Sequence, residues 1–196
     1  GEDTTTGASN VFLGHQAGMD RTTATYSVFV GAEAGALSTT GNFNTVVGSL
    51  AVSSAVATAH STTAVGTQAG QYLTSGHSNN LYGRAAGSNI TTGSKMIAIG
   101  SYALYGASGD ITGQDNIAIG SSSCFNTTSA WNTIAIGSQT IASGVLTGYY
   151  NTVIGANTGN NLTSGYNNNF IGPWAGYAAT TAFQSIAIGS DALRYA

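Results

Sequence analysis

A three-residue motif, two apolar residues followed by glycine, recurs along the whole chain and constrains its fold more than any other feature. Eleven copies occur, the first at Phe12-Leu13-Gly14 and the last at Ala187-Ile188-Gly189. Successive motif glycines are usually seventeen positions apart, as Gly14 and Gly31 are, with two spacings of eighteen and one of twenty. Self-similarity at a fixed short period indicates a chain of stacked identical units.

Other positions keep a constant register with the motif glycine, which we number as position zero. Position −8 is Thr or Ser and position −7 is Gly or Ala in all eleven copies. Position −4 is Asn in six copies, and position +3 is Ala in eight. Every insertion falls between +4 and −10, and the largest adds three residues within Tyr105 to Asp110. One corner of the repeat therefore absorbs all the variation in length.

A repeat of this length predicts a β-solenoid. It is too short for the helical repeats, which exceed roughly 30 residues. Its short apolar run ends in glycine, which is typical of a strand, and Gly and Asn elsewhere are turn formers. We predict an all-β, parallel solenoid of about eleven coils, forming a single repeat domain over residues 1–196. Coils stacked about 4.8 Å apart would form a rod roughly 50 Å long.

The two apolar positions of the motif must face opposite sides, because side chains alternate along a strand. We expect position −1, always large and apolar, to fill the coil interior. Position −2 is also apolar in every copy, and an apolar row on the outside marks an interface. We therefore predict a homotrimer whose axis is lined by this row. Its members are Phe12, Phe29, Val46, Ala64, Leu81, Ala98, Ala118, Ala135, Val153, Phe170 and Ala187.

Several segments resemble a known family of fibre proteins. Asn116-Ile117-Ala118-Ile119-Gly120 and Ser185-Ile186-Ala187-Ile188-Gly189 resemble the YadA-like head repeat of trimeric autotransporter adhesins. The segment from Asn151 to Asn167 looks like a related repeat of phage tail fibres and bacterial surface fibres, often found upstream of an endosialidase-type intramolecular chaperone. The resemblance implies a left-handed β-roll, wound as a trimer, that serves in attachment.

The low charge of the chain and its short apolar runs limit the kinds of partner that it can bind. Only 6% of residues are charged, the formal net charge is −3, and four Lys and Arg cannot neutralise many phosphates. No apolar run approaches the length that spans a bilayer. We expect no nucleic-acid partner and no membrane insertion. The single cysteine, Cys124, excludes an internal disulfide framework and is interpreted as a small core residue.

Residues suited to catalysis or metal binding do not form a motif. His15, His60 and His77 occupy two phases of the coil and share no spacing with Cys or carboxylates. Asp110 and Asp115 flank the longest insertion and are interpreted as solvated loop residues. No nucleophile elbow, phosphate loop or dinucleotide fingerprint occurs. We predict a protein that is not an enzyme and uses no cofactor or metal.

Aromatic and loop residues at the corners are the candidates for receptor binding. Exposed aromatic rings can stack on sugars or contact a protein receptor, and recognition is commonly carried by loops on a rigid scaffold. The variable corner leads this prediction. The candidates are Tyr105, Ser108, Asp110, Trp131, Tyr149 and Tyr150.

The predicted function is that of a non-enzymatic attachment fibre. We expect an extracellular protein, on a virion tail fibre or a bacterial cell surface, that binds a host-surface glycan or protein receptor. Two alternatives remain open: an ice-binding solenoid, suggested by Thr at −8 and −9, and a structural spacer or filament subunit. Because both ends of the sequence lie within the repeat, we also expect a fragment of a longer fibre that contacts neighbouring segments.

Overall fold

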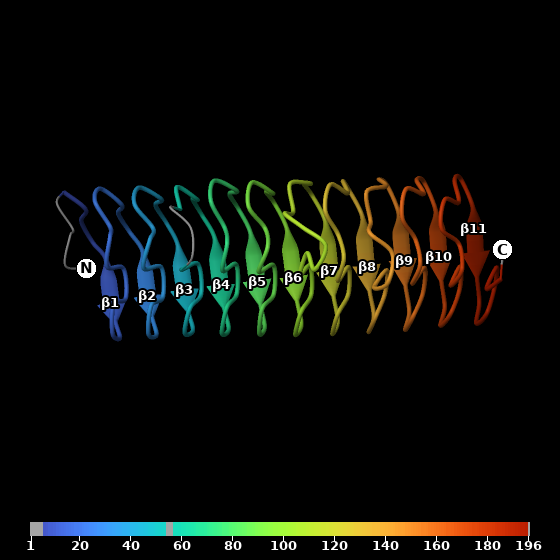
Figure 1. The fold of residues 1–196 in the computed structure, drawn as a ribbon, viewed down its shortest axis with the longest axis horizontal. Coiled ribbons are helices and arrows are strands. Elements are labelled where there is room, and N and C mark those ends of the chain that lie inside the picture. The colour runs from blue at the N-terminus through green and yellow to red at the C-terminus, as the bar shows by residue number, and fades with distance from the viewer. Residues whose placement is uncertain (1–5, 54–56, 196) are drawn as a thin grey trace.

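The computed structural model describes residues 6–53 and 57–195, and in them the chain is a β-solenoid (Figure 1). It contains one three-residue strand per repeat. The strands are β1 (Val11–Leu13), β2 (Val28–Val30), β3 (Thr45–Val47), β4 (Thr63–Val65), β5 (Asn80–Tyr82), β6 (Ile97–Ile99), β7 (Ile117–Ile119), β8 (Ile134–Ile136), β9 (Thr152–Ile154), β10 (Asn169–Ile171) and β11 (Ile186–Ile188). No helix occurs in this part of the chain, and hence none that could cross a membrane.

The eleven strands form one parallel sheet in sequence order, from β1 to β11. Each motif residue pairs with its equivalent in the next coil, as Phe12 pairs with Phe29 and Ala118 with Ala135. The result is a straight rod with the two ends of the chain at opposite ends of it (Figure 1). The all-β parallel solenoid predicted from the short period is thus confirmed. Residues 1–5 and 196, which bear on the predicted continuation of the fibre, lie outside the described residues.

The expected facing of the two apolar rows was wrong, because position −2 fills the coil interior and position −1 faces outward. Phe29, Leu81 and Ala135 are fully buried in the single chain, whereas Leu13 and Ile188 are 65% and 68% exposed. Of the row assigned to a trimer axis, all members except the partly buried Phe12 of the first coil are buried. That row therefore belongs to the core and is not available to a partner.

The physical reason for this facing is the packing of small residues around position −2. Each −2 side chain shares the interior with the residues at +3 and +4 of the coils, such as Ala34, Ala86 and Ala103. The outward face carries −1 together with −3, and −3 includes polar residues such as Asn80 and Asn169. A polar −3 side chain is tolerated only where it reaches solvent.

In most coils, the side chains at positions −2 and +4 of the same coil compensate for each other in size. Where −2 is Phe, +4 is Gly: a Cβ on Gly176 would lie 2.5 Å from the Phe170 ring. Where −2 is Ala, +4 is usually larger, as in Ala98 with Leu104, Ala118 with Cys124, Ala135 with Ile141, and Ala187 with Leu193. The exception is Ala64 with Gly70, where a Cβ on Gly70 would lie 2.9 Å from Leu81 and 3.4 Å from Val52, in the neighbouring coils. Close packing of this kind is typical of protein interiors.

The corners of each coil depend on left-handed backbone conformations at four positions, −5, 0, +2 and +4. At +4 these include bulky residues, such as Val52 with a φ of 48° and Ile141 with a φ of 47°. Such conformations cost roughly 1–2 kcal/mol for residues other than Gly. At position zero, φ is 129° at Gly120, and a Cβ there would collide with the Gly137 carbonyl of the next coil. This double constraint explains why zero is always glycine.

In the six coils that have asparagine at −4, its side chain joins the coil to the next one through two hydrogen bonds. Its Nδ2 donates to the carbonyl at −7 of the following coil, and its Oδ1 accepts from the amide at −4 of that coil. For Asn116 these partners are the Ala130 carbonyl at 2.6 Å and the Thr133 amide at 2.9 Å. The same pair of bonds is made by Asn10, Asn44, Asn79, Asn151 and Asn168.

Candidate functional site

The residues most often used for catalysis are dispersed along the rod. Among the described residues, no group of three or more His, Cys, Asp or Glu is placed to hold a metal ion. His15, His60 and His77 are exposed, as expected for turn residues. Cys124 is buried, and its burial raises the pKa of the thiol to about 12, which agrees with its interpretation as a core residue.

Arg21 is the buried charged residue of the described chain, and it is packed rather than placed in a cavity. Its guanidinium lies 4.3 Å from the centre of the Phe29 ring and donates a hydrogen bond of 2.7 Å to the Gly41 carbonyl. Burial lowers its pKa to about 10. In three other coils the equivalent position holds the buried Leu73, Ile90 and Leu162, so Arg21 occupies a position that can belong to the core.

The variable corner carries the first three receptor candidates. Tyr105 stacks on Phe125, with ring centres 5.2 Å apart, and meets the edge of Tyr102 at the same distance. Ser108 and Asp110 are exposed, and the Ser108 hydroxyl donates to Asn126 Oδ1 at 3.3 Å. Tyr105 is thus half-buried within an aromatic cluster, while Ser108 and Asp110 project from the inserted loop.

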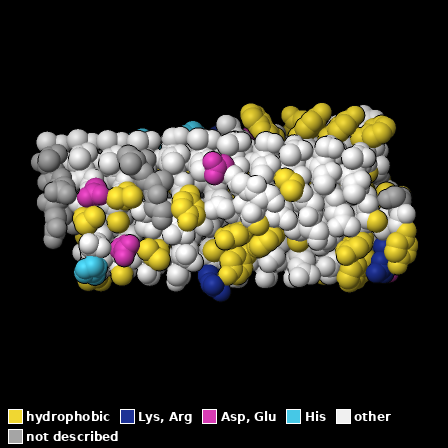
Figure 2. Space-filling view, viewed as in Figure 1, with side chains coloured by type: hydrophobic (Ala, Val, Ile, Leu, Met, Phe, Trp, Pro, Cys, Tyr) yellow, Lys and Arg dark blue, Asp and Glu magenta, His cyan; other side chains and the backbone are white. Residues whose placement is uncertain are grey.

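A second surface follows positions −8 and −6, which lie on the same face of each coil. Position −8, always Thr or Ser, is exposed in all eleven coils. Position −6 is mostly polar in the earlier coils and becomes aromatic in the last four, at Trp131, Tyr149, Tyr166 and Phe183. Figure 2 shows hydrophobic side chains gathered along the upper edge over this C-terminal part of the rod. We call these four residues the aromatic row.

Most of the aromatic row is stacked. Tyr149 and Tyr166 have ring centres 5.2 Å apart and an interplanar angle of 17°, and Tyr166 and Phe183 are 5.9 Å apart at 19°. Trp131 and Tyr149 pair through their backbones but not through their rings. The row is therefore open between the coils of β8 and β9.

A pocket of about 370 Å³ lies at this opening. It is lined by Trp131, Tyr149 and Tyr150 together with Ser129, Asn132 and Thr147. The three aromatic side chains are 48%, 44% and 58% exposed. The structure thus brings three of the receptor candidates together, and adds two hydroxyls and a carboxamide to them.

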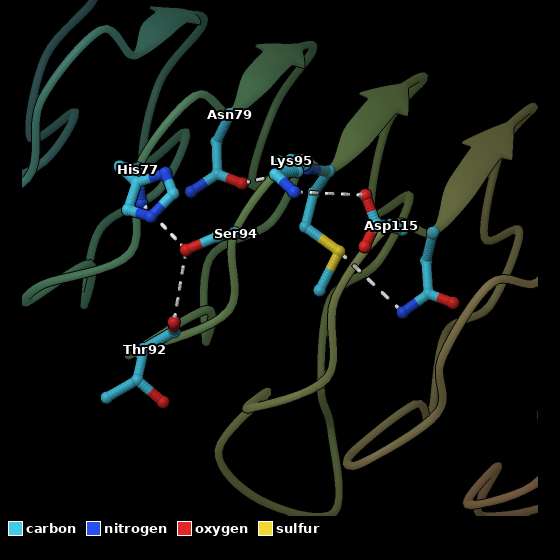
Figure 3. Close-up of polar contacts among 8 residues, drawn as sticks. His77, Asn79, Thr92, Ser94, Lys95 and Asp115 are labelled. Carbon is cyan, nitrogen blue, oxygen red and sulfur yellow. Dashed lines mark hydrogen bonds and ion pairs between the residues drawn. The ribbon is translucent and has the colours of Figure 1, made fainter.

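Polar contacts connect the coils of β5, β6 and β7 just before their strands begin (Figure 3). Ser94 Oγ accepts a hydrogen bond of 3.0 Å from the His77 amide and donates one of 3.5 Å to the Thr92 carbonyl. Lys95 Nζ lies 4.0 Å from Asp115 Oδ1. These two opposite charges are thus paired with each other across neighbouring coils.

The outward strand face is the third surface. Position −1 is apolar in all eleven coils and fully buried in none of them. Tyr82, Ile99 and Ile171 are 41%, 41% and 37% exposed, and the first and last members are more so. This face lies on the opposite side of the strands from the core.

Sequence reasoning missed the polar residues that line the pocket and the partners of Tyr105. The sequence identifies Ser129 and Thr147 only as members of the Thr or Ser row at −8, and it gives Asn132 no role. The signal was available, because Ser129 and Thr147 lie two residues before an aromatic residue at −6. Phe125 could not be found in the same way, because its contact with Tyr105 crosses an inserted loop.

No family model, no curated protein and no solved structure matches this chain. Inferences about its activity therefore depend on its own residues.

Proposed function

We propose that this chain is a segment of a non-enzymatic attachment fibre in which three copies pack through their outward strand faces. The fibre would act outside the cell, on a virion tail or a bacterial surface, and bind a glycan or protein of a host. The observation that carries the proposal is the unbroken outward row at −1. Exposed apolar patches of this extent mark interfaces.

Closed assembly of identical chains is the simplest use of such a row. An apolar row that runs the whole length of a straight rod is matched by the same row on a second and third copy around a shared axis. The number three is what the resemblance to adhesin and tail-fibre repeats implies. The −8 and −6 positions lie on another face of the coil, so this packing leaves the pocket open to solvent.

Light scattering tests the association. We expect a mass of three times 19.6 kDa, and a monomer at micromolar concentration would refute the proposal. The double variant Ile119→Asp, Ile136→Asp should give folded monomers, because outward carboxylates would be buried unpaired in the assembly. Thr112→Asp, on the −8 face, is the matched control and should leave the trimer intact.

The attachment role is tested by binding of labelled wild-type protein to candidate host cells. A trimer that binds no cell and no isolated surface glycan or protein would be a structural spacer instead. This binding test is therefore independent of the test for trimer formation.

An ice-binding surface is a second candidate, because the −8 row offers eleven exposed Thr or Ser side chains in one line. Its neighbour at −9 is half-buried or buried in most coils, and Ala57, Ile111 and Leu146 interrupt it. The aromatic row also projects beside it at the C-terminal end. A thermal-hysteresis measurement on the wild-type protein decides between this role and attachment.

A further inference from the structure

The pocket between the coils of β8 and β9 has the chemistry of a carbohydrate site. Trp131, Tyr149 and Tyr150 provide apolar faces and polar edges. Ser129 and Thr147 provide hydroxyls that both donate and accept, and Asn132 provides a carboxamide with the same capacity. A pyranose ring needs this combination, because its C–H face is apolar and its rim carries hydroxyls.

The rings of Tyr149 and Tyr150 and the backbone of Trp131 are held in place before any ligand binds. Tyr149 is stacked on Tyr166 at 5.2 Å and meets the edge of Tyr150 at 5.5 Å and 86°. The backbone of Trp131 is bridged to that of Tyr149, and the Tyr150 amide donates a hydrogen bond of 3.0 Å to the Trp131 carbonyl. A preformed site loses less side-chain entropy on binding.

The size of the pocket sets the length of ligand that it holds. A volume of about 370 Å³ lies at the lower end of the range of roughly 300–1,000 Å³ for ligand pockets. On the side of β10, the lining residue Tyr149 is covered by the stacked ring of Tyr166. The pocket therefore suits one ring, or one ring and its neighbour, and not an extended polymer.

The uncharged lining of the pocket favours a neutral ligand. None of the six lining residues is Asp, Glu, Lys, Arg or His. A carboxylate or sulfate on the ligand would find no cation in the lining. A proline-rich peptide, which also uses aromatic surfaces, would leave the two hydroxyls and the carboxamide largely unused.

We infer that this pocket binds a neutral pyranose residue of a host-surface glycan. The inference rests on the proposed attachment function and names its ligand class. Of the six predicted receptor candidates, it favours Trp131, Tyr149 and Tyr150 over the inserted loop that carries Tyr105, Ser108 and Asp110.

The test uses the full 196-residue chain and a panel of neutral oligosaccharides, namely lactose, maltotriose and tri-N-acetylglucosamine, with 3′-sialyllactose as the charged comparison. Binding is measured by saturation-transfer NMR and by the tryptophan fluorescence of the Trp174→Phe variant, in which Trp131 is the only indole. We expect saturable binding of at least one neutral saccharide at millimolar concentration.

Two variants and a matched control locate the site. Trp131→Ala should weaken binding by about tenfold or more, as expected for truncation of a central aromatic contact. Thr147→Val, which replaces a hydroxyl with a methyl group, should weaken it several-fold. Trp174→Ala makes the same change in a half-buried aromatic outside the pocket, and should leave affinity unchanged. Circular dichroism of each variant confirms that the coil is intact.

The outcomes separate this inference from the proposed function. No binding of any neutral saccharide, equal binding by Trp131→Ala, or a preference for 3′-sialyllactose would each overturn it. Binding of a proline-rich peptide in place of saccharide would assign the pocket to a protein receptor. In all of these cases trimer formation and host-cell binding, measured on the same samples, still decide the attachment function independently.

Discussion

Asn79 is bonded to the next coil through the backbone of Met96, whose amide donates a hydrogen bond of 2.9 Å to Asn79 Oδ1 (Figure 3). Asn79 Nδ2 also donates to the Gly93 carbonyl at 3.0 Å. Both partners are buried backbone groups that find no solvent. The side chain therefore satisfies two buried backbone groups of the next coil.

Removal of this link should destabilise the fold. Asn79→Ala leaves a buried N–H and a buried C=O unsatisfied, each costing about 1–3 kcal/mol, and we expect a total loss of about 2–4 kcal/mol. Urea unfolding followed by circular dichroism measures it. Asn161→Ala is the control, because the half-buried Asn161 is not at −4 and makes no bond of this kind. Equal effects of the two variants would show that the −4 bonds contribute nothing specific.

Substitutions at Ala135 and Ile141 should have coupled effects on the free energy of unfolding, because the two side chains compensate for each other in size. Ala135→Phe alone overpacks the interior, and Ile141→Gly alone leaves a cavity, so each should cost about 1–4 kcal/mol. The double variant recreates the Phe and Gly pair seen at Phe170 and Gly176. A double-mutant cycle should therefore give a favourable coupling of about 1–3 kcal/mol, whereas additive effects would contradict this compensation.

The motif glycine can be tested by two substitutions that separate backbone strain from collision. Gly120→Ala meets both an unfavourable φ of 129° and the Gly137 carbonyl of the next coil, while Gly189→Ala has a φ of 118° and no atom within 4 Å. We expect Gly189→Ala to cost about 1–3 kcal/mol from strain alone, and Gly120→Ala to cost clearly more. The thermal midpoints of the two variants provide the comparison. Similar midpoints would mean that the collision with the next coil adds nothing to the cost of the strained φ angle.

Cys124 should make stability depend on alkaline pH. Burial raises the pKa of its thiol from 9.0 to about 12, so the unfolded chain loses this proton at a lower pH than the folded chain. Stability should therefore fall as pH rises from about 9 to about 12. Cys124→Ala should show a shallower fall over that window, because it lacks the thiol. Indistinguishable urea midpoints across the window would argue against a buried neutral thiol.

Access to the same thiol provides an independent check of the core. Because the thiolate is the reactive form, iodoacetamide should modify Cys124 only when the protein unfolds. Mass spectrometry after incubation with and without guanidinium measures this. Rapid modification of the native protein would place Cys124 outside the core.

The architecture was predictable from the sequence because it depends on spacing. A short period with glycine at a fixed place permits one short strand and tight corners, and nothing larger. The parallel register of β1 to β11 follows, since every coil repeats the one before it. Thr and Ser at −8 and the aromatic residues at −6 were likewise visible as corner residues before their contacts were known.

Side-chain packing decides which of the two apolar strand positions points into the core, and the apolar positions in the sequence do not show how the side chains pack. Positions −1 and −2 are both apolar in every copy, so alternation could not say which of them is inside. The sizes of the residues at −2 and +4 do indicate which position is inside. The large Phe29 occurs with Gly35, and the small Ala135 occurs with Ile141. Such compensation is needed only between side chains that share the same interior space. The pocket at Trp131 and Tyr149 depends in the same way on ring orientations in two adjacent coils, and only the tertiary structure sets these.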